Sequence, residues 1–425
     1  MTRIAIVDGI RTPFMKAGSL FQDMTAHQLG AMVVRELLER TSLDPELVDE
    51  VVMGCVANPV EAANVGRVIS LLAGIPERKR AYTVSRNCAS GFESITSASE
   101  KIATSFDEIV IAGGAESMSN IPLLFGREMS KQLTRLAKAK TPVQKLGALA
   151  SFRPRHFKPL IGVMLGLTDP VCGLNMGQTA EVVAKELGIT REEQDQFALM
   201  SHERSIAARE KLSEEIMPVL LPPKYKVLAE KDNGPREGQT IEALQKLRPF
   251  FDRKTATVTV GNACPVTDGA AVVLMMTEQK AKQLGYEPLG FIKSYTYEGL
   301  APNKMGLGPA YAIPVSLKKA GLKLKDIELV EINEAFAAQV LGSLKLMKSK
   351  EFAKDVLGES EPVGDLDTNI LNVNGGAIAV GHPVGVTGTR LVLTLLKEMK
   401  RRNVKYGVAS LCIGGGQGGA VVLER

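Results

Sequence analysis

The feature that most constrains this chain is a strand–helix order that occurs twice. In the first third, short apolar runs alternate with segments whose apolar residues recur at helical spacing: strands at 4–7, 51–56 and 108–112, and helices after Thr25 and over 65–73. The last third repeats the order: strands at 290–294, 327–332 and 406–411, and helices over 309–320 and 388–401. Strands that alternate with helices predict a mostly parallel sheet covered on both faces. We interpret the two α/β halves as an internal duplication.

Residues 121–252 do not follow this rhythm. They begin with a basic helical stretch and continue through several prolines, which predict irregular structure. Strand-like sequence returns at 257–260 and 271–275. We therefore predict three domains: an N-terminal half of residues 1–120 and 253–277, an insertion (loop) domain of residues 121–252, and a C-terminal half of residues 278–425.

Cys88 lies where a β-prone run ends in a turn and a helix begins. At such a place the thiol lies near the unpaired N–H groups and the positive dipole end of the helix. We expect this environment to lower the pKa of the thiol below its usual value of about 8.5 and to supply thiolate near neutral pH. The alternative is a buried cysteine that packs as a small apolar side chain, which is the commoner role of a single cysteine.

Three further polar residues follow strand candidates in the last third. Asn333 comes after the strand at 327–332, His382 lies in a glycine- and proline-rich turn, and Cys412 ends the strand at 406–411. Ligands bind beyond the carboxyl ends of strands in open α/β sheets. Taken singly, these residues are also explained as a capping asparagine, a turn histidine and a core cysteine. Their joint occurrence favours a functional site.

Together the four residues are sufficient for carbon–carbon bond chemistry beside a thioester. A thiolate can hold an acyl group, with histidine as its proton partner. A second thiol can serve as the acid or base at the α-carbon of an acetyl group. An asparagine and the N–H groups of glycine-rich turns can stabilise oxyanions. This chemistry requires no metal and no redox cofactor.

The motifs Cys88-Ala-Ser-Gly, Asn333-Glu-Ala-Phe-Ala, Gly381-His382-Pro and Cys412-Ile-Gly-Gly-Gly resemble those of the thiolase family, in this order and spacing. The resemblance covers nearly the whole chain. It implies the thiolase fold, in which two duplicated βαβαβ halves form layers of helices and sheets (α/β/α/β/α) and a loop domain is inserted.

The resemblance also implies a ping-pong acyl transfer in which coenzyme A (CoA) is a substrate. Cys88 would take the acyl group, and His382 would activate its thiol. Cys412 would protonate the departing acetyl-CoA enolate, or deprotonate acetyl-CoA in the condensing direction. One oxyanion hole is implied at His382 and a water held by Asn333, and the other at the N–H groups of Cys88 and Gly414. Contacts to CoA are implied for a further set of residues: Met176, Arg236, Cys264, Met305 and Phe336.

The subgroup is left open by features that point in different directions. Cys264 stands where many thiolases have a serine hydroxyl near the pantetheine, and the chain has Leu174-Asn-Met-Gly where many have His-Met-Gly. The long basic insertion resembles the thiolase subunits of fatty-acid oxidation complexes, whereas Asn333 is the wider-family form of a position that is often histidine in those subunits. A 3-ketoacyl-CoA thiolase (acetyl-CoA acyltransferase) of β-oxidation is the first hypothesis. An acetyl-CoA acetyltransferase that acts on acetoacetyl-CoA is the second, and a non-catalytic acyl-lipid-binding protein on a thiolase fold is a remote third.

Whole-chain features suggest a compartment and partners. Five dispersed cysteines without metal-site spacing, and no signal-peptide pattern, predict a cytoplasmic protein. Residues 121–170 hold nine Lys and Arg against two acidic residues, so basicity is local and a nucleic-acid footprint is not expected. Apolar residues within the basic segment suggest peripheral membrane contact through residues 127–167, or docking to a partner. The family resemblance implies a homodimer or tetramer, with a hydratase/dehydrogenase α-subunit as a further partner.

Overall fold

The computed structural model describes residues 2–252 and 256–425. It separates into two compact units, of which the larger contains Met1–Asn120 and Asp169–Arg425 and the smaller contains Ile121–Thr168. No helix in the described ranges is long and apolar enough to cross a membrane.

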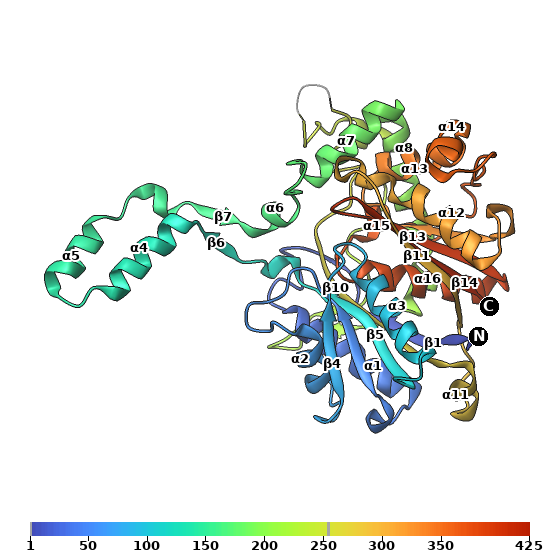
Figure 1. Cartoon of the computed structure of the whole chain (residues 1–425), viewed down its shortest axis with the longest axis horizontal. Helices are drawn as coiled ribbons and strands as arrows, with labels where there is room; N and C mark the ends of the chain where they lie inside the picture. Colours follow the sequence, from blue (N-terminus) through green and yellow to red (C-terminus); the bar gives the residue numbers. More distant parts are fainter. Residues whose placement is uncertain (1, 253–255) are drawn as a thin grey trace. The chain divides into compact units, whose positions relative to one another are not determined.

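The N-terminal half of the larger unit begins with the predicted strand–helix order (Figure 1). Its elements are β1 (Ile4–Arg11), β2 (Met15–Lys16), α1 (Ala26–Thr41), β3 (Glu50–Gly54), α2 (Val65–Leu72), β4 (Arg80–Val84), α3 (Ser90–Ala103), β5 (Ile109–Glu116), β10 (Thr267–Thr277) and α11 (Glu278–Gln283). The helix predicted after Thr25 is confirmed and begins with a capping box, in which the Thr25 side chain accepts from the backbone N–H of Gln28 and the Gln28 side chain accepts from that of Thr25.

The C-terminal half repeats this order. Its elements are β11 (Gly290–Gly299), α12 (Gly308–Ala320), β12 (Leu329–Ile332), α13 (Ala337–Met347), α14 (Lys350–Phe352), α15 (Ala377–Val380), α16 (Thr387–Arg402), β13 (Tyr406–Ile413) and β14 (Gln417–Glu424). The strands of the first half lie in the order β1-β10-β5-β3-β4 and those of the second in the order β11-β14-β13-β12. Leu371 forms an isolated parallel bridge with Val330 of β12. This bridge occupies the position that corresponds to β4, which pairs with β3 in the first half. The matching orders support the duplication.

The expectation of a mostly parallel sheet was wrong. Parallel pairing occurs at β3–β4, β3–β5 and β12–β13, whereas β1, β10, β11 and β14 pair antiparallel with their neighbours. In the first half the chain returns as β10 between β1 and β5, and in the second β13 turns directly into β14. Gly415 and Gly416 adopt φ of 94° and 85° in that turn, a backbone conformation that glycine adopts without strain.

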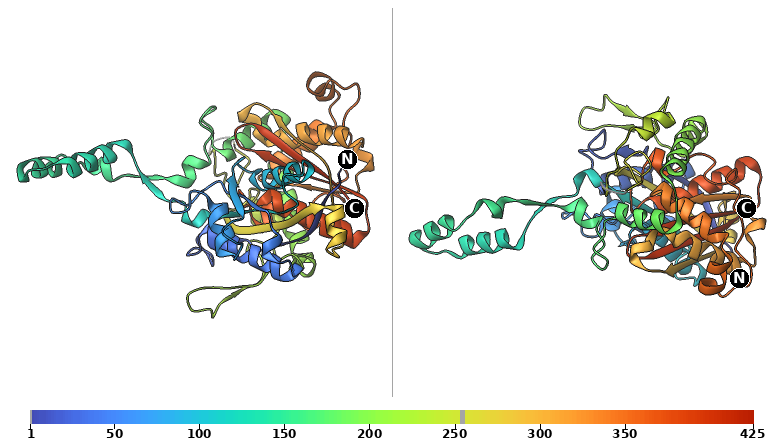
Figure 2. Two further views of the ribbon diagram at one scale, coloured as in Figure 1. Left: turned by 60° about the horizontal axis from the view of Figure 1, so that its bottom comes forward. Right: turned by 90° about the horizontal axis from the view of Figure 1, so that it is seen from above.

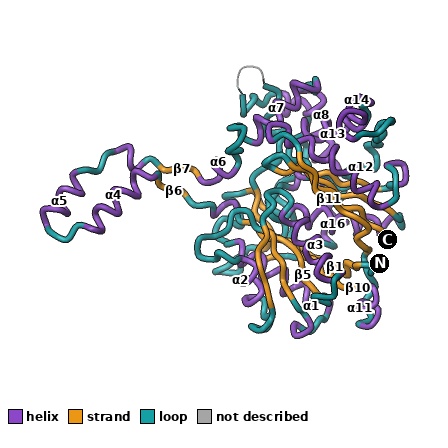
Figure 3. Tube along the Cα trace, viewed as in Figure 1, coloured by secondary structure: helices purple, strands orange, loops and turns teal. Residues whose placement is uncertain are grey.

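The predicted layering α/β/α/β/α is confirmed. Helices α1 and α2 cover one side of the first half's strands in one apolar cluster, and α12 and α13 cover the second half's strands in another. Helices α3 and α16 form the middle layer, where Phe92 of α3 and Leu391 of α16 share a core with strands of both halves. Pairing of β1 with β11 joins the halves into one continuous sheet (Figures 1 and 3).

The predicted insertion at 121–252 covers more chain than the smaller unit, which ends at Thr168. Residues 169–252 belong to the larger unit because their helices contribute to its cores: Phe197 packs with the cluster of α12 and α13, and Ala180 with that of Phe336. The elements of this stretch are α7 (Met176–Leu187), α8 (Arg191–Ala207), α9 (Arg209–Ser213), β8 (Val219–Leu220), β9 (Leu228–Ala229) and α10 (Ile241–Gln245). Figure 2 shows the hairpin of β8 and β9 in yellow-green.

The predicted strand at 257–260 was also wrong. The backbone N–H groups of Thr257 and Val258 donate to the Glu181 carboxylate, and that of Thr259 donates to Asn262 Oδ1. Side chains therefore satisfy the donors that a strand ladder would use.

The smaller unit is a two-stranded ribbon with a helical hairpin (Figure 1). Its elements are β6 (Leu123–Phe125), α4 (Arg127–Lys138), α5 (Pro142–Ala150), β7 (Pro159–Ile161) and α6 (Gly162–Gly166). β6 pairs antiparallel with β7. The hydroxyl of Ser151 donates to Gln132 Oε1 at 2.7 Å and links the end of α5 to α4. Much of this unit's apolar surface is exposed: Leu123, Leu124, Phe125, Leu133, Val143, Leu146, Leu149, Phe157, Leu160, Ile161, Met164 and Leu165.

Candidate active site

Cys88 lies in the turn between β4 and α3. Asn87, which precedes it, has φ of 46°, a left-handed conformation that asparagine tolerates better than most residues. The Asn87 side-chain amide donates to the carbonyl of Gly414 at 2.7 Å, so the Cys88 turn is tied to the turn between β13 and β14. The two turns come from opposite halves of the sequence and bring Cys88 and Gly414 together.

The environment of the Cys88 thiol does not lower its pKa. Burial raises the pKa and outweighs the hydrogen bonds from the backbone N–H groups of Gly414 and of Cys88 itself, which favour the thiolate. The predicted thiolate at the start of the helix was therefore wrong for the resting protein. The sequence places Cys88 at a helix N-terminus, but it does not reveal how much protein surrounds the sulfur.

His382 lies in a loop between α15 and α16 that is held from three sides. Its backbone N–H donates to Thr267 Oγ1 at 3.2 Å, and the N–H of Gly385 donates to the buried carboxylate of Glu116 at 2.7 Å. Its ring Nδ1 lies 2.6 Å from Thr387 Oγ1. The other ring nitrogen, Nε2, is buried and has no hydrogen-bond partner among the described residues.

The His382 ring is held neutral. Burial, together with the nearby guanidinium of Arg390, lowers the pKa of His382 to about 3. Arg390 is itself buried, and its Nη1 donates to Glu331 Oε2 at 2.9 Å. A neutral imidazole with an unpartnered nitrogen can accept a proton from a thiol.

Glycines let the His382 loop lie against the first half. A Cβ on Gly114 of β5 would collide with the carbonyl oxygen of Gly385, and a Cβ on Gly91 of α3 would lie 2.7 Å from the backbone nitrogen of Thr389. The N-terminal turns of α3 and α16 are therefore in direct contact. This contact holds the Cys88 and His382 segments at the same end of the middle layer.

Asn333 follows β12, and its backbone N–H donates to the carbonyl of Ser410 in β13 at 2.9 Å. Its side chain is fully buried, and neither Oδ1 nor Nδ2 has a partner within the described part of the chain. The next residue, Glu334, is bonded on all sides: its carboxylate accepts from Ser201 Oγ, Asn372 Nδ2 and the N–H of Ile378. Unpartnered buried amide groups are costly, and they favour a site that a ligand or water completes.

Cys412 lies in an apolar cluster with four of the five residues implied for CoA contact: Met176, Cys264, Met305 and Phe336. Burial and the neighbouring thiols of Cys88 and Cys264 raise the pKa of Cys412 well above its ordinary value. Burial, with Cys88 nearby, raises the pKa of Cys264 to about 12. The three thiols therefore form one group, in which Cys412 is protonated at neutral pH and suited to act as an acid.

Arg236, the fifth residue, lies outside that cluster. Its side chain is exposed, and its backbone N–H donates to His202 Nδ1 at 3.3 Å. Burial lowers the pKa of His202 to about 4, with Arg236 and Lys16 as further causes. The neighbouring Gly234 lies against the carbonyl of Ala379, three residues before His382. Arg236 therefore joins a cationic surface next to the His382 loop and does not contact the thiols.

The match with known proteins covers both halves. The family described as "Thiolase, N-terminal domain" matches residues 4–279, and "Thiolase, C-terminal domain" matches residues 286–425. A 3-ketoacyl-CoA thiolase of Pectobacterium atrosepticum is 44% identical over 99% of this chain and 96% of its own length.

The chain belongs to the thiolase family.

Two solved thiolase structures extend this result. The acetyl-CoA acetyltransferase of Bacillus anthracis has a TM-score of 0.87 and 36% identity, and the match covers 100% of this chain and 99% of that one. Human mitochondrial 3-ketoacyl-CoA thiolase, in a structure with CoA, has a TM-score of 0.85 and 36% identity, and the match covers 100% and 98%. As a thiolase, this protein is an acyltransferase, and the predictions of family, fold and enzyme class are confirmed. The individual roles of the site residues stay predictions.

The sequence interpretation missed the residues that hold the site together. Glu116 and Glu334 are buried carboxylates that accept backbone N–H groups of the segment from Ile378 to Gly385. Burial raises the pKa of both. Their signal in the sequence was an acidic residue directly beside a motif: Glu116 follows Gly113-Gly-Ala, and Glu334 follows Asn333. Thr387 lies five residues after His382 and carries no such signal.

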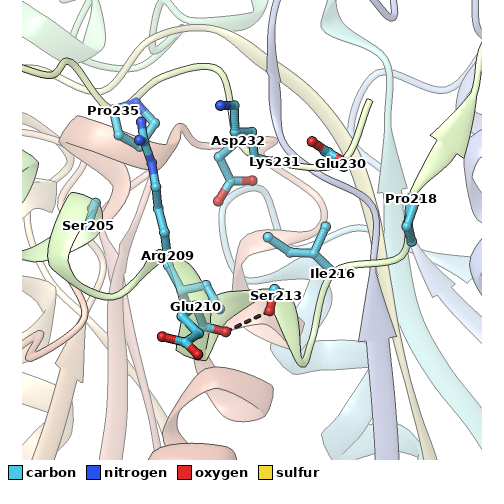
Figure 4. Close-up of a pocket in the computed structure, with 11 residues that line it drawn as sticks. Ser205, Arg209, Glu210, Ser213, Ile216, Pro218, Glu230, Lys231, Asp232 and Pro235 are labelled. Carbon is cyan, nitrogen blue, oxygen red and sulfur yellow. Dashed lines mark hydrogen bonds between the residues drawn. The ribbon is translucent and has the colours of Figure 1, made fainter. Parts of the chain in front are cut away.

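A hollow of about 410 Å³ is formed by residues of α8, α9 and the segment 216–235 (Figure 4). Ser205, Arg209 and Asp232 are among its lining residues. Two of its charged residues are paired, since Arg209 bonds to Glu237 and Asp232 accepts two bonds from the buried Arg11. None of the predicted site residues lines it. Among the described residues, no group of three or more His, Cys, Asp or Glu side chains is arranged to hold a metal ion.

Proposed function

We propose that this thiolase cleaves 3-ketoacyl-CoA with CoA, giving acetyl-CoA and an acyl-CoA shortened by two carbons, as a step of fatty-acid β-oxidation. The observation that carries this proposal is the grouping of the Cys88, Cys264 and Cys412 thiols. His382 and Asn333 add buried polar atoms that have no partner among the described residues. The activity of the 44% identical relative supports the substrate class.

In the first half-reaction, Cys88 Sγ attacks the 3-keto carbon while its proton moves to His382 Nε2. The N–H groups of Cys88 and Gly414 stabilise the resulting oxyanion. The bond between the α- and β-carbons then breaks and leaves the acyl group on Cys88. Acetyl-CoA departs as its enolate, whose oxygen is stabilised by His382 and a water held by Asn333. Cys412 donates its proton to the enolate carbon.

In the second half-reaction, a new CoA thiol attacks the acyl group on Cys88. Cys412, left as a thiolate by the first half, takes the CoA proton and regains its starting form. The tetrahedral oxyanion forms again near Cys88 and Gly414, and Cys88 leaves with the proton that His382 held. The cycle uses thiol, imidazole, amide and backbone groups, so we propose that CoA is a substrate and that no cofactor takes part.

For CoA binding we propose the apolar cluster around Cys412. Met176, Met305 and Phe336 offer an apolar surface for the pantetheine arm, and the Cys264 thiol replaces the hydroxyl that many thiolases place there. Arg236 together with Lys16 offers positive charge next to the His382 loop for the CoA phosphates. The lowering of the Lys16 pKa by burial and by Arg236 supports this, because two close cations gain stability when an anion binds between them.

The test is the rate of thiolysis of 3-ketoacyl-CoA substrates from four to sixteen carbons, measured for the wild type and Cys88→Ala side by side. We expect activity beyond four carbons in the wild type, and a loss of at least about 1,000-fold in the variant. Activity confined to acetoacetyl-CoA would favour the second candidate, an acetyl-CoA acetyltransferase, which the likeness to the Bacillus anthracis enzyme supports. If the wild type cleaved none of these substrates, both candidate functions would be contradicted.

We further propose a cytoplasmic homodimer or tetramer, with docking to a hydratase/dehydrogenase α-subunit as a second level of assembly. All five cysteines are free, which fits a reducing compartment. Sedimentation of the purified chain would test the oligomeric state.

The smaller unit supports a proposal of peripheral membrane contact through residues 127–167. Its exposed apolar side chains, such as Val143 at 81% and Leu146 at 70% exposed, alternate with Lys and Arg on α4 and α5. An amphipathic, basic helical hairpin binds anionic lipid by burying its apolar side while its cations contact headgroups.

A further inference from the structure

We propose that Thr387 is a positioning residue that keeps the proton of His382 on Nδ1, so that Nε2 retains the lone pair needed to accept the Cys88 proton. The inference rests on the proposed function, because it assigns a partner to the base of that mechanism. Thr387 itself contacts neither thiol nor substrate in the mechanism and acts through the ring.

The two nitrogens of His382 have different surroundings. Nδ1 lies 2.6 Å from Thr387 Oγ1, and Nε2 has no partner among residues 2–252 and 256–425. A neutral imidazole carries one proton, and the hydrogen bond at one nitrogen decides which of the two holds it. Which nitrogen of His382 holds the proton therefore depends on whether Thr387 Oγ1 accepts a hydrogen bond from Nδ1 or donates one to it.

The hydroxyl of Thr387 has one hydrogen and two neighbours. Besides Nδ1, it lies 3.0 Å from the carbonyl oxygen of Pro383, which can only accept. If the hydroxyl donates to Pro383, its oxygen accepts from Nδ1–H and both bonds form. If it donates to Nδ1, the bond to Pro383 is lost. Because each hydrogen bond formed inside the protein adds stability, the arrangement with both bonds, and hence with the proton on Nδ1, is favoured.

The geometry around Thr387 is fixed. It is the first residue of α16, its backbone N–H also donates to the Pro383 carbonyl at 3.1 Å, and the side chain is fully buried. A β-branched side chain has few χ1 choices. The His382 ring, the Thr387 hydroxyl and the Pro383 carbonyl therefore belong to one turn of the chain. This arrangement limits rotation of the imidazole.

The consequence concerns the two states of the ring during catalysis. With Nδ1–H bonded to Thr387, Nε2 accepts the Cys88 proton without a change of tautomer, and the protonated ring keeps its bond to Oγ1. With the opposite tautomer, Nε2 would already carry a hydrogen and could not accept the proton. Removal of the hydroxyl leaves both tautomers open and frees the ring to turn.

The direct test uses the wild-type protein labelled with ¹⁵N-histidine. The chain has four histidines, so His382→Gln identifies its two ring signals. We expect a protonated Nδ1 and an unprotonated Nε2 at neutral pH. A protonated Nε2 would overturn the proposal, and this measurement needs no variant of Thr387.

The functional test compares three variants by kcat and by the rate at which iodoacetamide alkylates Cys88, with thermal unfolding as a check on folding. Thr387→Val removes the hydroxyl and keeps the shape, and Thr387→Ser keeps the hydroxyl. Thr394→Val is the matched control, because it removes a buried hydroxyl of the same helix that bonds to Glu215 and not to His382. We expect Thr387→Val to lower both rates by at least about 10-fold, with the other two near the wild type.

Equal rates for Thr387→Val and Thr394→Val would overturn the proposal. His382→Ala separates this failure from failure of the proposed function. If His382→Ala leaves alkylation and thiolysis unchanged, His382 is not the base and the mechanism itself is wrong. If His382→Ala is slow while Thr387→Val is not, the mechanism stands and the role of Thr387 is rejected.

Discussion

Residue by residue, the site consists of groups that are uncharged at neutral pH. Burial raises the pKa of Cys88, Cys264 and Cys412 and lowers that of His382 to about 3. A thiolate–imidazolium pair is therefore not the resting state. The nucleophile forms as its proton moves to His382 during attack, which keeps a reactive thiolate from standing free in the protein.

A first prediction separates the two thiols. In Cys412→Ala, acyl-CoA should still acylate Cys88, because the leaving CoA thiolate can take from water the proton that Cys412 otherwise supplies. Cleavage of 3-ketoacyl-CoA should fall by about 100-fold or more, because the enolate has lost its acid. Intact-protein mass after incubation with acyl-CoA, together with a thiolysis assay, measures both. Equal losses in the two reactions would contradict the role of Cys412 as the acid at the enolate carbon, because they would place its main effect in acyl transfer.

A second prediction concerns acid stability. In the unfolded chain His382 binds a proton below about pH 6.5, whereas in the folded chain its pKa is about 3. Between these values the unfolded state holds more protons, so lowering the pH favours unfolding. From pH 6.5 to 5.0 the wild type should lose about 1.5 kcal/mol more than His382→Gln. Urea unfolding of both proteins at the two pH values measures the difference, and identical losses would contradict the buried neutral ring.

Residue identities were largely predictable from the sequence, and their surroundings were not. Cys88, Asn333, His382 and Cys412 stood out because they follow strands or lie among glycines. The direction of the Cys88 pKa shift could not be read in the same way, because it depends on protein packed around the sulfur from distant segments. Thr387 was missed because a threonine at the start of a helix is common.

Among the elements, the middle helices α3 and α16 position the site. Their first turns touch through Gly91 and Gly388, and a Cβ on Gly388 would collide with the backbone of Phe92. The sequence predicted both helices, but not that they share one layer. It also missed the strand directions, because an antiparallel strand such as β10 has the same composition as a parallel one and is distinguished by where the chain returns.

A third prediction follows from this contact. Gly388→Ala should destabilise the protein by about 1–3 kcal/mol, because the backbone of α3 cannot give way as a flexible side chain would. Activity should fall as well, since both Cys88 and His382 depend on these helix starts. Gly147→Ala is the control, because that glycine lies in α5 with no atom near an added Cβ. Thermal unfolding and kcat measure the effects, and an equally mild result at both positions would contradict the close approach.

At the scale of the whole molecule, the chain combines a duplicated catalytic body with a separate small unit. The duplication was visible in the sequence because its strand–helix order repeats. The limits of the small unit were not visible in the sequence, because residues 169–252 lack the repeat and yet contribute helices to the main cores. The basic and apolar residues of 121–168 were visible in the sequence. The exposure of the apolar side chains was not, because exposure depends on packing.

A fourth prediction tests the small unit's proposed lipid contact. Changing Arg135, Lys138 and Lys145 to Glu should weaken binding to phosphatidylglycerol–phosphatidylcholine vesicles by at least about 100-fold, since each cation near an anionic surface contributes about 1 kcal/mol. The kcat for soluble substrate should stay unchanged. The control is a triple variant of the larger unit with the same change in charge, in which Glu replaces Lys325, Lys350 and Lys354. Vesicle co-sedimentation measures both, and equal binding by the two triple variants would reject the lipid contact.

The most direct test of the central claim is to locate the acyl group. The protein is incubated with a 3-ketoacyl-CoA of eight carbons without free CoA, quenched in acid and mapped by peptide mass spectrometry. We predict a six-carbon acyl group on the peptide that contains Cys88, with one equivalent of acetyl-CoA released, and no acyl group in Cys88→Ala. An acyl group on Cys264 or Cys412, or release of acetyl-CoA without any acyl-protein, would contradict the account.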